Sequence, residues 1–185
     1  MQQAGRRAHR AAATIVVLVA LLATALGVGP LAGTARAAYV SPPLSAFDSR
    51  LVHDINHARV NRGLRPLTVT AGTTDVAHGW SCRLAVLGLL EHNPLLAVQL
   101  ATHGSNLWTM YAENVGMLPA SSGADRLFRA YMASPEHRAN ILDRSARFIG
   151  VWSKKSGGVR YNTIDFVGSA RSAYDDNYGV ARRTC

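Results

Sequence analysis

The chain has 185 residues, of which 48% are hydrophobic, with 20 Lys and Arg, 11 Asp and Glu, and two cysteines. This length fits one domain, or at most two small ones, and the hydrophobic share excludes a disordered chain. Two cysteines exclude both a disulfide-rich miniprotein and a zinc site with four cysteine ligands. The formal net charge of +9 raises the question of nucleic-acid binding, which depends on where the charges lie.

Residues 1–37 are typical of a secretory signal peptide. Arginines within residues 1–10 precede an uncharged, largely apolar stretch over 11–35, and the small residues at 35–37 offer a cleavage site. We therefore predict that the protein is exported, with cleavage after Ala37. The alternative is an uncleaved membrane anchor, because the uncharged stretch is long enough to span a bilayer. This segment is the only contact with a membrane that the sequence predicts.

The rest of the chain, 38–185, keeps a net charge of only +5, because four basic residues and no acidic residue precede Ala38. Nucleic-acid binding needs a concentrated basic face. Basic residues adjoin one another only at Lys154-Lys155 and Arg182-Arg183. We therefore predict no nucleic-acid partner.

Apolar residues at three- and four-residue steps predict two helices after a short leader at 38–47. The first helix is expected over about 45–61 and the second over about 74–89. The second would place one set of apolar residues on a single face: Val76, Trp80, Leu84 and Leu87. Residues 91–106 are expected to be a loop with a helical turn or two.

The second half of the chain predicts a strand, two short helices and a hairpin. The strand is expected over 111–118, and one helix begins near Asp125. Ser134 and Pro135 are typical of a helix start, which predicts a helix over 135–142. Two strands are expected near 147–153 and 159–167, with a glycine pair in the turn between them. This order favours an α+β fold, with helices packed on an antiparallel sheet.

The chain after the signal holds only three glutamates, and two of them directly precede a histidine. These are Glu91-His92 and Glu136-His137, and the third is Glu113. Two imidazoles and one carboxylate are the protein half of a zinc site with positions open for water or substrate. The same groups could perform acid–base chemistry without a metal. The alternative is that they are helix caps and hydrogen-bonded polar residues, since no short spacing ties them together.

His53 and His57 mimic the two histidines of a metalloprotease helix, with Asp54 in place of the catalytic glutamate. Histidines four residues apart share a helix face. That face points away from the apolar stripe of Leu51 and Ile55, however, so we expect both histidines to lie in solvent.

Cys82 lies inside the second predicted helix, which argues against a catalytic nucleophile. In an exported protein the simpler interpretation is a disulfide with Cys185, which would fix the tail at 169–185 to the domain. By the chain-entropy model such a long loop contributes about 4–5 kcal/mol. Two free or intermolecular thiols are the alternative.

Several segments, in order, resemble the motifs of one family. They are Leu51 to Arg59 with Gly63 to Leu67, His92-Asn93, Ala112 to Val115, Tyr131 to Leu142, Ile149 to Val151 and Asp165-Phe166. Together they resemble the CAP superfamily, the cysteine-rich secretory, antigen 5 and pathogenesis-related proteins, in its bacterial SCP-domain form. The resemblance covers about 48–168.

The resemblance implies a three-layer α–β–α sandwich with a small, mainly antiparallel sheet and a central cleft. It implies that His92, Glu113 and His137 line this cleft, where Zn²⁺ or another divalent ion binds in relatives. The two histidines would be ligands, with Glu113 as a third. Supporting residues would be Asn114, Ser134, Arg138 and Asn140. One departure is that the second acid of larger relatives is missing from the stretch Tyr131 to Ser134.

The resemblance also implies a secreted binding module, whose partner is a lipid, a protein or an envelope component and whose activity a metal modulates. The alternative is a metal-assisted hydrolase that acts on peptide or cell-envelope material. Such an enzyme lacks an evident general base unless Glu91 or Glu136 turns inward. A third possibility is a structural protein with an inert cleft. We favour binding on family analogy rather than on site chemistry.

Overall fold

The computed structural model describes residues 43–103 and 108–169, and it confirms the α+β fold. The predicted signal peptide, its cleavage site and Cys185 lie outside the described residues. The pairing of Cys82 with Cys185 therefore stays a prediction. Among the described helices, none has the length and apolar character needed to cross a bilayer.

A four-stranded sheet in the order β1-β3-β4-β2 forms the middle layer. The long strands β2 (Trp108–Pro119), β3 (Phe148–Ser156) and β4 (Val159–Ser169) pair antiparallel. The two-residue strand β1 (Thr68–Val69) joins β3 in parallel. Sequence patterns did not predict β1, because two exposed residues give no alternation of apolar and polar side chains.

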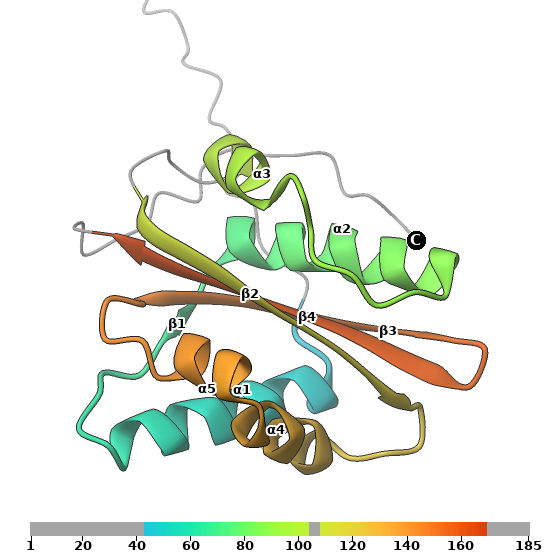
Figure 1. Cartoon of the computed structure of the whole chain (residues 1–185), viewed down its shortest axis with the longest axis horizontal. Coiled ribbons are helices and arrows are strands. Elements are labelled where there is room, and N and C mark those ends of the chain that lie inside the picture. The colour runs from blue at the N-terminus through green and yellow to red at the C-terminus, as the bar shows by residue number, and fades with distance from the viewer. Residues whose placement is uncertain (1–42, 104–107, 170–185) are drawn as a thin grey trace, which may run out of the picture. The chain divides into compact units, whose positions relative to one another are not determined.

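Helices cover both faces of the sheet (Figure 1). One layer holds α1 (Ala46–Val60), α4 (Ala124–Ala133) and α5 (Pro135–Ile141), and the other holds α2 (Ala71–Leu87) and α3 (Leu96–His103). The larger hydrophobic cluster joins the sheet to the first layer, and two smaller clusters join it to the second.

Local sequence explains where several helices begin and end. The Ser45 side chain accepts a hydrogen bond from the Asp48 amide at the start of α1. Ser134 does the same at α5, where Pro135 occupies the first turn. Gly88 ends α2 in the left-handed conformation, with φ of +66°.

The second helix differs from its prediction at both ends. It begins at Ala71 rather than near residue 74, and it ends at Leu87 rather than near residue 89. Its first turn packs so closely on the sheet that a Cβ on Gly150 would collide with the Thr73 backbone. The expected stripe is buried at Val76, Trp80 and Leu84, whereas Leu87, in the last turn on the same face, is 43% exposed. The segment after α2 contains the two helical turns expected there, as α3.

Candidate functional site

The motif Ala112-Glu113-Asn114 lies in the middle of β2, where successive side chains point to opposite faces of the sheet. Glu113 contacts the segment between α2 and α3, and Asn114 contacts α5. This short motif therefore makes contacts with both helical layers.

Glu113 holds His92 on the α2–α3 side. His92 Nδ1 lies 2.7 Å from Glu113 Oε1, and the Asn93 amide donates to the same oxygen at 2.9 Å. The carboxylate side chain is 3% exposed, whereas the imidazole is 64% exposed. Burial raises the pKa of Glu113, and the hydrogen bonds from Asn93 and His92 oppose that rise. A buried acid thus fixes an exposed imidazole.

A pocket of about 260 Å³ adjoins this pair, and its lining comes from β2 and from the segment leading into α3. Its apolar walls include Pro94, Leu96, Ala97 and Tyr111, and its polar side groups include His92 and Glu113. Concave sites of this kind, apolar with a few fixed polar groups, are typical of small-ligand binding.

His137 lies in the other helical layer, on α5. Its ring meets the edge of the Tyr131 ring, with centroids 5.1 Å apart, and its backbone carbonyl accepts from Asn114 Nδ2 at 3.0 Å. Burial lowers the pKa of His137, and His92 lowers it further. The two imidazoles are therefore electrostatic neighbours, although His137 is not among the residues that line the 260 Å³ pocket.

The four predicted supporting residues lie around α5. Asn140 Nδ2 donates to Asn114 Oδ1 at 2.9 Å and to the Glu113 carbonyl at 3.2 Å, and so ties α5 to β2. The Arg138 guanidinium donates to the Met132 carbonyl, and Ser134 caps the helix. These contacts hold His137 in place through its backbone rather than through its ring.

The predicted zinc site is not confirmed. Within 43–103 and 108–169, no three His, Cys, Asp or Glu side chains come together as a metal ligand set. His92 and Glu113 supply two groups, and the Glu113 oxygen that meets His92 already accepts from the Asn93 amide. Since a catalytic zinc needs about three protein ligands, His92 and Glu113 by themselves do not complete such a site.

Two other sequence hypotheses are now answered. His53 and His57 lie exposed on α1 with their rings 6.3 Å apart, as expected for solvent-facing histidines. Glu91 and Glu136 are also exposed, so neither turns inward as a general base.

The structure adds one residue that sequence reasoning missed as a site residue, Asp165. It lies directly opposite Glu113 in the β2–β4 ladder and is fully buried. Neither of its carboxylate oxygens has a hydrogen-bond partner among the described residues, and Glu113 Oε2 also has none. Burial, together with the Glu113 charge, raises the pKa of Asp165 well above its usual range. The sequence signal was an acid between the apolar residues Ile164 and Phe166 within the predicted strand over 159–167.

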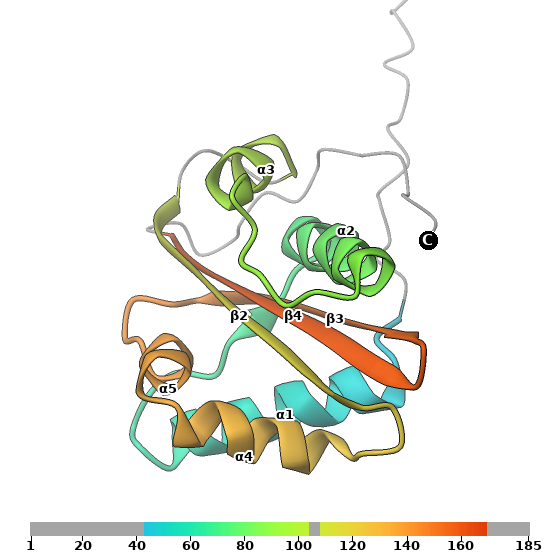
Figure 2. The same ribbon diagram turned by 45° about the vertical axis from the view of Figure 1, so that its right-hand side comes forward.

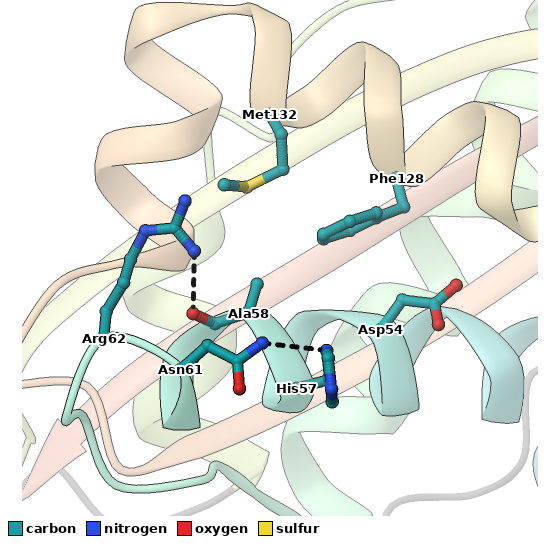
Figure 3. Close-up of a pocket in the computed structure, with 7 residues that line it drawn as sticks. All are labelled: Asp54, His57, Ala58, Asn61, Arg62, Phe128 and Met132. Atoms are coloured by element: carbon teal, nitrogen blue, oxygen red, sulfur yellow. Dashed lines mark hydrogen bonds between the residues drawn. The ribbon is translucent and has the colours of Figure 1, made fainter.

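A second pocket, of about 320 Å³, lies between α1 and α4 (Figure 3). Phe128 and Met132 form its apolar side, and His57, Arg62 and Asp54 supply polar groups. Arg62 donates to the Ala58 carbonyl at 2.9 Å, which keeps its guanidinium at the pocket.

Arg59 is a further buried residue, on the side of α1 that faces α5. Its guanidinium donates to the carbonyls of Arg65, Ile141, Asp143 and Ala146. These bonds fix the end of α5 and the connection to β3 to the first helix.

Solved structures share this fold. An outer surface protein of Borrelia burgdorferi aligns with a TM-score of 0.59 at 15% identity, over 65% of this chain and 91% of that one. An extracellular SCP-domain protein of Bacillus anthracis aligns with a TM-score of 0.57 at 20% identity, over 70% of this chain and 45% of that one. NaASP2, solved with Zn²⁺, aligns with a TM-score of 0.56 at 10% identity, over 77% of this chain and 92% of that one.

At these identities the structural likeness shows the fold alone. A search of curated proteins finds no match in sequence. The model of the cysteine-rich secretory protein family, however, matches residues 52–169, which include every motif segment from His92 to Asp165. The chain therefore belongs to the CAP, or cysteine-rich secretory protein, family.

Proposed function

We propose that this CAP domain is a secreted binding module whose ligand enters the pocket at His92 and Glu113. The observation that carries the proposal is the exposed imidazole fixed by a buried carboxylate, 2.7 Å apart, beside apolar walls. The imidazole offers Nε2 to a polar group of the ligand, and the walls offer burial to its apolar part. Secretion rests on the predicted signal peptide and on the extracellular relative from Bacillus anthracis.

Binding is favoured over hydrolysis by the residues available. Of the eight residues that line the pocket, none is Ser, Thr or Cys, so the described lining offers no side-chain nucleophile of those types. Hydrolysis by activated water would need a second polar group to orient it, and Glu91 and Glu136 both face solvent elsewhere. Zinc binding stays a prediction from the family resemblance, since it would require the His137 ring as an added ligand.

The test is a fragment library screened by saturation-transfer NMR against the protein and its variants. We expect fragments that bind the protein to lose at least tenfold in affinity in His92→Ala and in Glu113→Gln. The matched control is His53→Ala, which removes an equally exposed histidine from α1. Equal affinity in all four proteins would refute this site, and turnover of a peptide or envelope substrate that Glu113→Gln abolishes would replace binding by catalysis.

The pocket between α1 and α4 supports a second candidate, an amphipathic anionic ligand such as a fatty acid. Its apolar side at Phe128 and Met132 lies next to the donors of Arg62 and His57 (Figure 3). Titration with dodecanoate, followed in Met132→Asp and Arg62→Gln, tests this candidate separately. A dodecanoate affinity that both variants leave unchanged would exclude it.

A further inference from the structure

The connections that follow α1 and α5 are the feature that carries a further inference. The first, 61–67, leads from α1 to β1, and the second, 142–147, leads from α5 to β3. Both lie at the same end of the molecule, where β1 joins β3 (Figure 2). They carry one acidic residue, Asp143, and four arginines, which we call the arginine cluster: Arg62, Arg65, Arg144 and Arg147.

The buried guanidinium of Arg59 holds the two connections together. It donates to the carbonyl of Arg65 at 2.9 Å on one side and to the carbonyl of Ala146 at 3.3 Å on the other. The Thr68 amide adds a bond to the Arg147 carbonyl at 2.9 Å. Since a guanidinium is a small, rigid fork of donors, the residues that bind it lie close together. Arginines that are scattered in the sequence therefore become neighbours in the fold.

The charges around Arg59 agree with this placement. Burial lowers the pKa of Arg59, the Asp143 charge opposes that shift, and the Arg147 charge adds to it. The Asp143 carboxylate accepts from the Ser145 amide at 2.7 Å rather than from any member of the arginine cluster. One acid therefore lies among several arginines, and this end of the molecule is positively charged.

The side chains of the arginine cluster are available to a partner. Arg62, Arg65 and Arg144 are exposed, and Arg147 is half-buried. Among the described residues, no carboxylate forms an ion pair with any of the four. Arg62 donates one hydrogen bond, to the Ala58 carbonyl, which leaves most of its five N–H donors unused.

Two other exposed arginines of the same helical layer already have acidic partners. Arg50 pairs with Asp54 at 2.9 Å on α1, and Arg129 pairs with Asp125 at 2.7 Å on α4. Each pair joins residues four apart on one helix, where opposite charges are neighbours. The arginine cluster differs from them, because its guanidiniums gather without a matching set of acids.

Guanidinium groups in this setting favour phosphate as their ligand, because their planar fork matches two phosphate oxygens. A single exposed contact is weak and is screened by salt, so a free phosphate ion would bind poorly. Several phosphates on one chain engage several guanidiniums at once and bind far more tightly. The two connections contain no aromatic side chain on which a nucleic-acid base could stack. The match is therefore to phosphate groups repeated along a chain.

An anionic membrane surface is the less favoured occupant. Binding at a membrane interface usually buries Trp, Phe or Leu side chains at the level of the headgroups. The leucines of the two connections are buried or half-buried. The exposed apolar residues that flank the first connection are only Val60 and Val69. A polymer in solution needs no such apolar contact.

We propose that the arginine cluster binds a linear polymer that carries phosphate groups along its chain. This site goes beyond the proposed function, since none of its arginines lines the pocket at His92. Bound in this way, the protein would be held at a phosphate-bearing surface while the His92 pocket stays free for its own ligand.

The test is calorimetric titration of the full chain with long-chain inorganic polyphosphate at several salt concentrations. We expect the double variant Arg65→Gln/Arg144→Gln to lose at least tenfold in affinity. Its plot of log affinity against log salt concentration should become less steep by about two. The matched control is Arg50→Gln/Arg129→Gln, which removes the same charge from the same helical layer and should lose less than threefold. All four side chains are exposed, so both variants should keep the parent melting temperature.

Three results would overturn the inference. Polyphosphate that does not bind even at low salt would exclude a phosphate site. Equal losses in the two double variants would show that net charge alone attracts the polymer. Anionic phospholipid vesicles that bind more tightly than polyphosphate, and that need Arg65 and Arg144, would replace the polymer by a membrane surface. Fragment binding at the His92 pocket should be unchanged in Arg65→Gln/Arg144→Gln, so the two proposals can fail separately.

Discussion

His92 and His137 come from similar Glu-His pairs in the sequence, yet the fold treats them differently. His92 is mostly exposed, and its ring is held directly by the buried Glu113 carboxylate. His137 is half-buried, and it is held mainly through its backbone, which Asn114 and the Ser134 cap fix in place. The first arrangement leaves an imidazole open to solvent at the pocket, whereas the second ties α5 to β2. The comparison teaches that the contacts of a histidine, rather than its motif, decide its role.

The largest effect is expected in Arg59→Met, because Arg59 fixes the end of α5, the helix that carries His137. This change removes the charge that binds four carbonyls, including that of Ile141 at the end of α5 and that of Ala146 in the connection to β3. We expect about 3–4 kcal/mol of lost stability, because buried carbonyls lose charged donors. Urea denaturation measures the loss.

The matched control for Arg59→Met is Arg50→Gln on the same helix. Arg50 makes an exposed ion pair with Asp54, so its loss should leave the stability nearly unchanged. A similar loss of stability in both variants would contradict the anchoring role of Arg59.

Asn114→Ala should break the link between β2 and α5, the helix that carries His137. Asn114 is fully buried, donates to the His137 carbonyl and accepts from Asn140. We expect a loss of about 2 kcal/mol, because the half-buried His137 carbonyl loses its donor and Asn140 keeps only its bond to the Glu113 carbonyl. Hydrogen exchange of the α5 amides should speed up more than exchange in α3, and uniform acceleration would argue against a local link.

Asp165→Asn should stabilise the protein at neutral pH. This variant concerns the His92 side of the comparison, because Asp165 lies opposite Glu113. Burial raises the pKa of Asp165 above its unfolded value near 3.8, so the folded state holds the extra proton. The stability of the parent protein should therefore be greatest below that value and fall as pH rises toward the folded pKa. We expect a gain of about 1 kcal/mol in the variant at pH 7, from thermal unfolding across pH 4–8.

The control is Asp125→Asn. Asp125 is exposed, and its hydrogen bond with Arg129 lowers its pKa. That variant should show the opposite sign, with any loss of stability confined to pH above its unfolded pKa. A parent protein whose stability rises steadily with pH would contradict the buried neutral acid at Asp165.

The smallest expected effect is a shift in the pKa of His137 when His92 is replaced. The His92 charge lowers the pKa of His137, so His92→Gln should raise that pKa while leaving stability nearly unchanged. Histidine ring signals followed by NMR titration measure the shift. His53→Gln should leave the pKa of His137 unaltered. An equal shift in that pKa in both variants would show that His92 has no specific effect on His137.

Sequence patterns predicted most of this fold, because long amphipathic elements carry their own signal. The stripe of Leu51 and Ile55 marked α1, and Ser134-Pro135 marked the start of α5. The two-residue strand β1 was missed, since its pairing with β3 comes from tertiary contact. Leu87 lies on the predicted apolar face but is exposed, because periodicity does not show where the sheet beneath a helix ends.

The candidate site was predictable only in part. The motifs named His92, Glu113 and His137, and the structure brings the first two into direct contact. The strand predicted over 111–118 puts Glu113 and Asn114 on opposite faces, but which helical layer each side chain contacts depends on the tertiary fold. Asp165 was overlooked as a site residue because its neighbourhood depends on the register of β4 with β2, which spans about fifty residues of sequence.

The most direct test of the account is the ¹⁵N spectrum of the histidine rings above the pH at which they are charged. Because Glu113 Oε1 also accepts from the Asn93 amide, the account predicts that His92 donates from Nδ1 and carries its proton there. Free histidine favours the Nε2–H form, and His92 should revert to it in Glu113→Ala, which removes the acceptor oxygen, while His137 stays unchanged. An Nε2–H proton on His92 in the parent protein would contradict the carboxylate-held imidazole on which the proposed site depends.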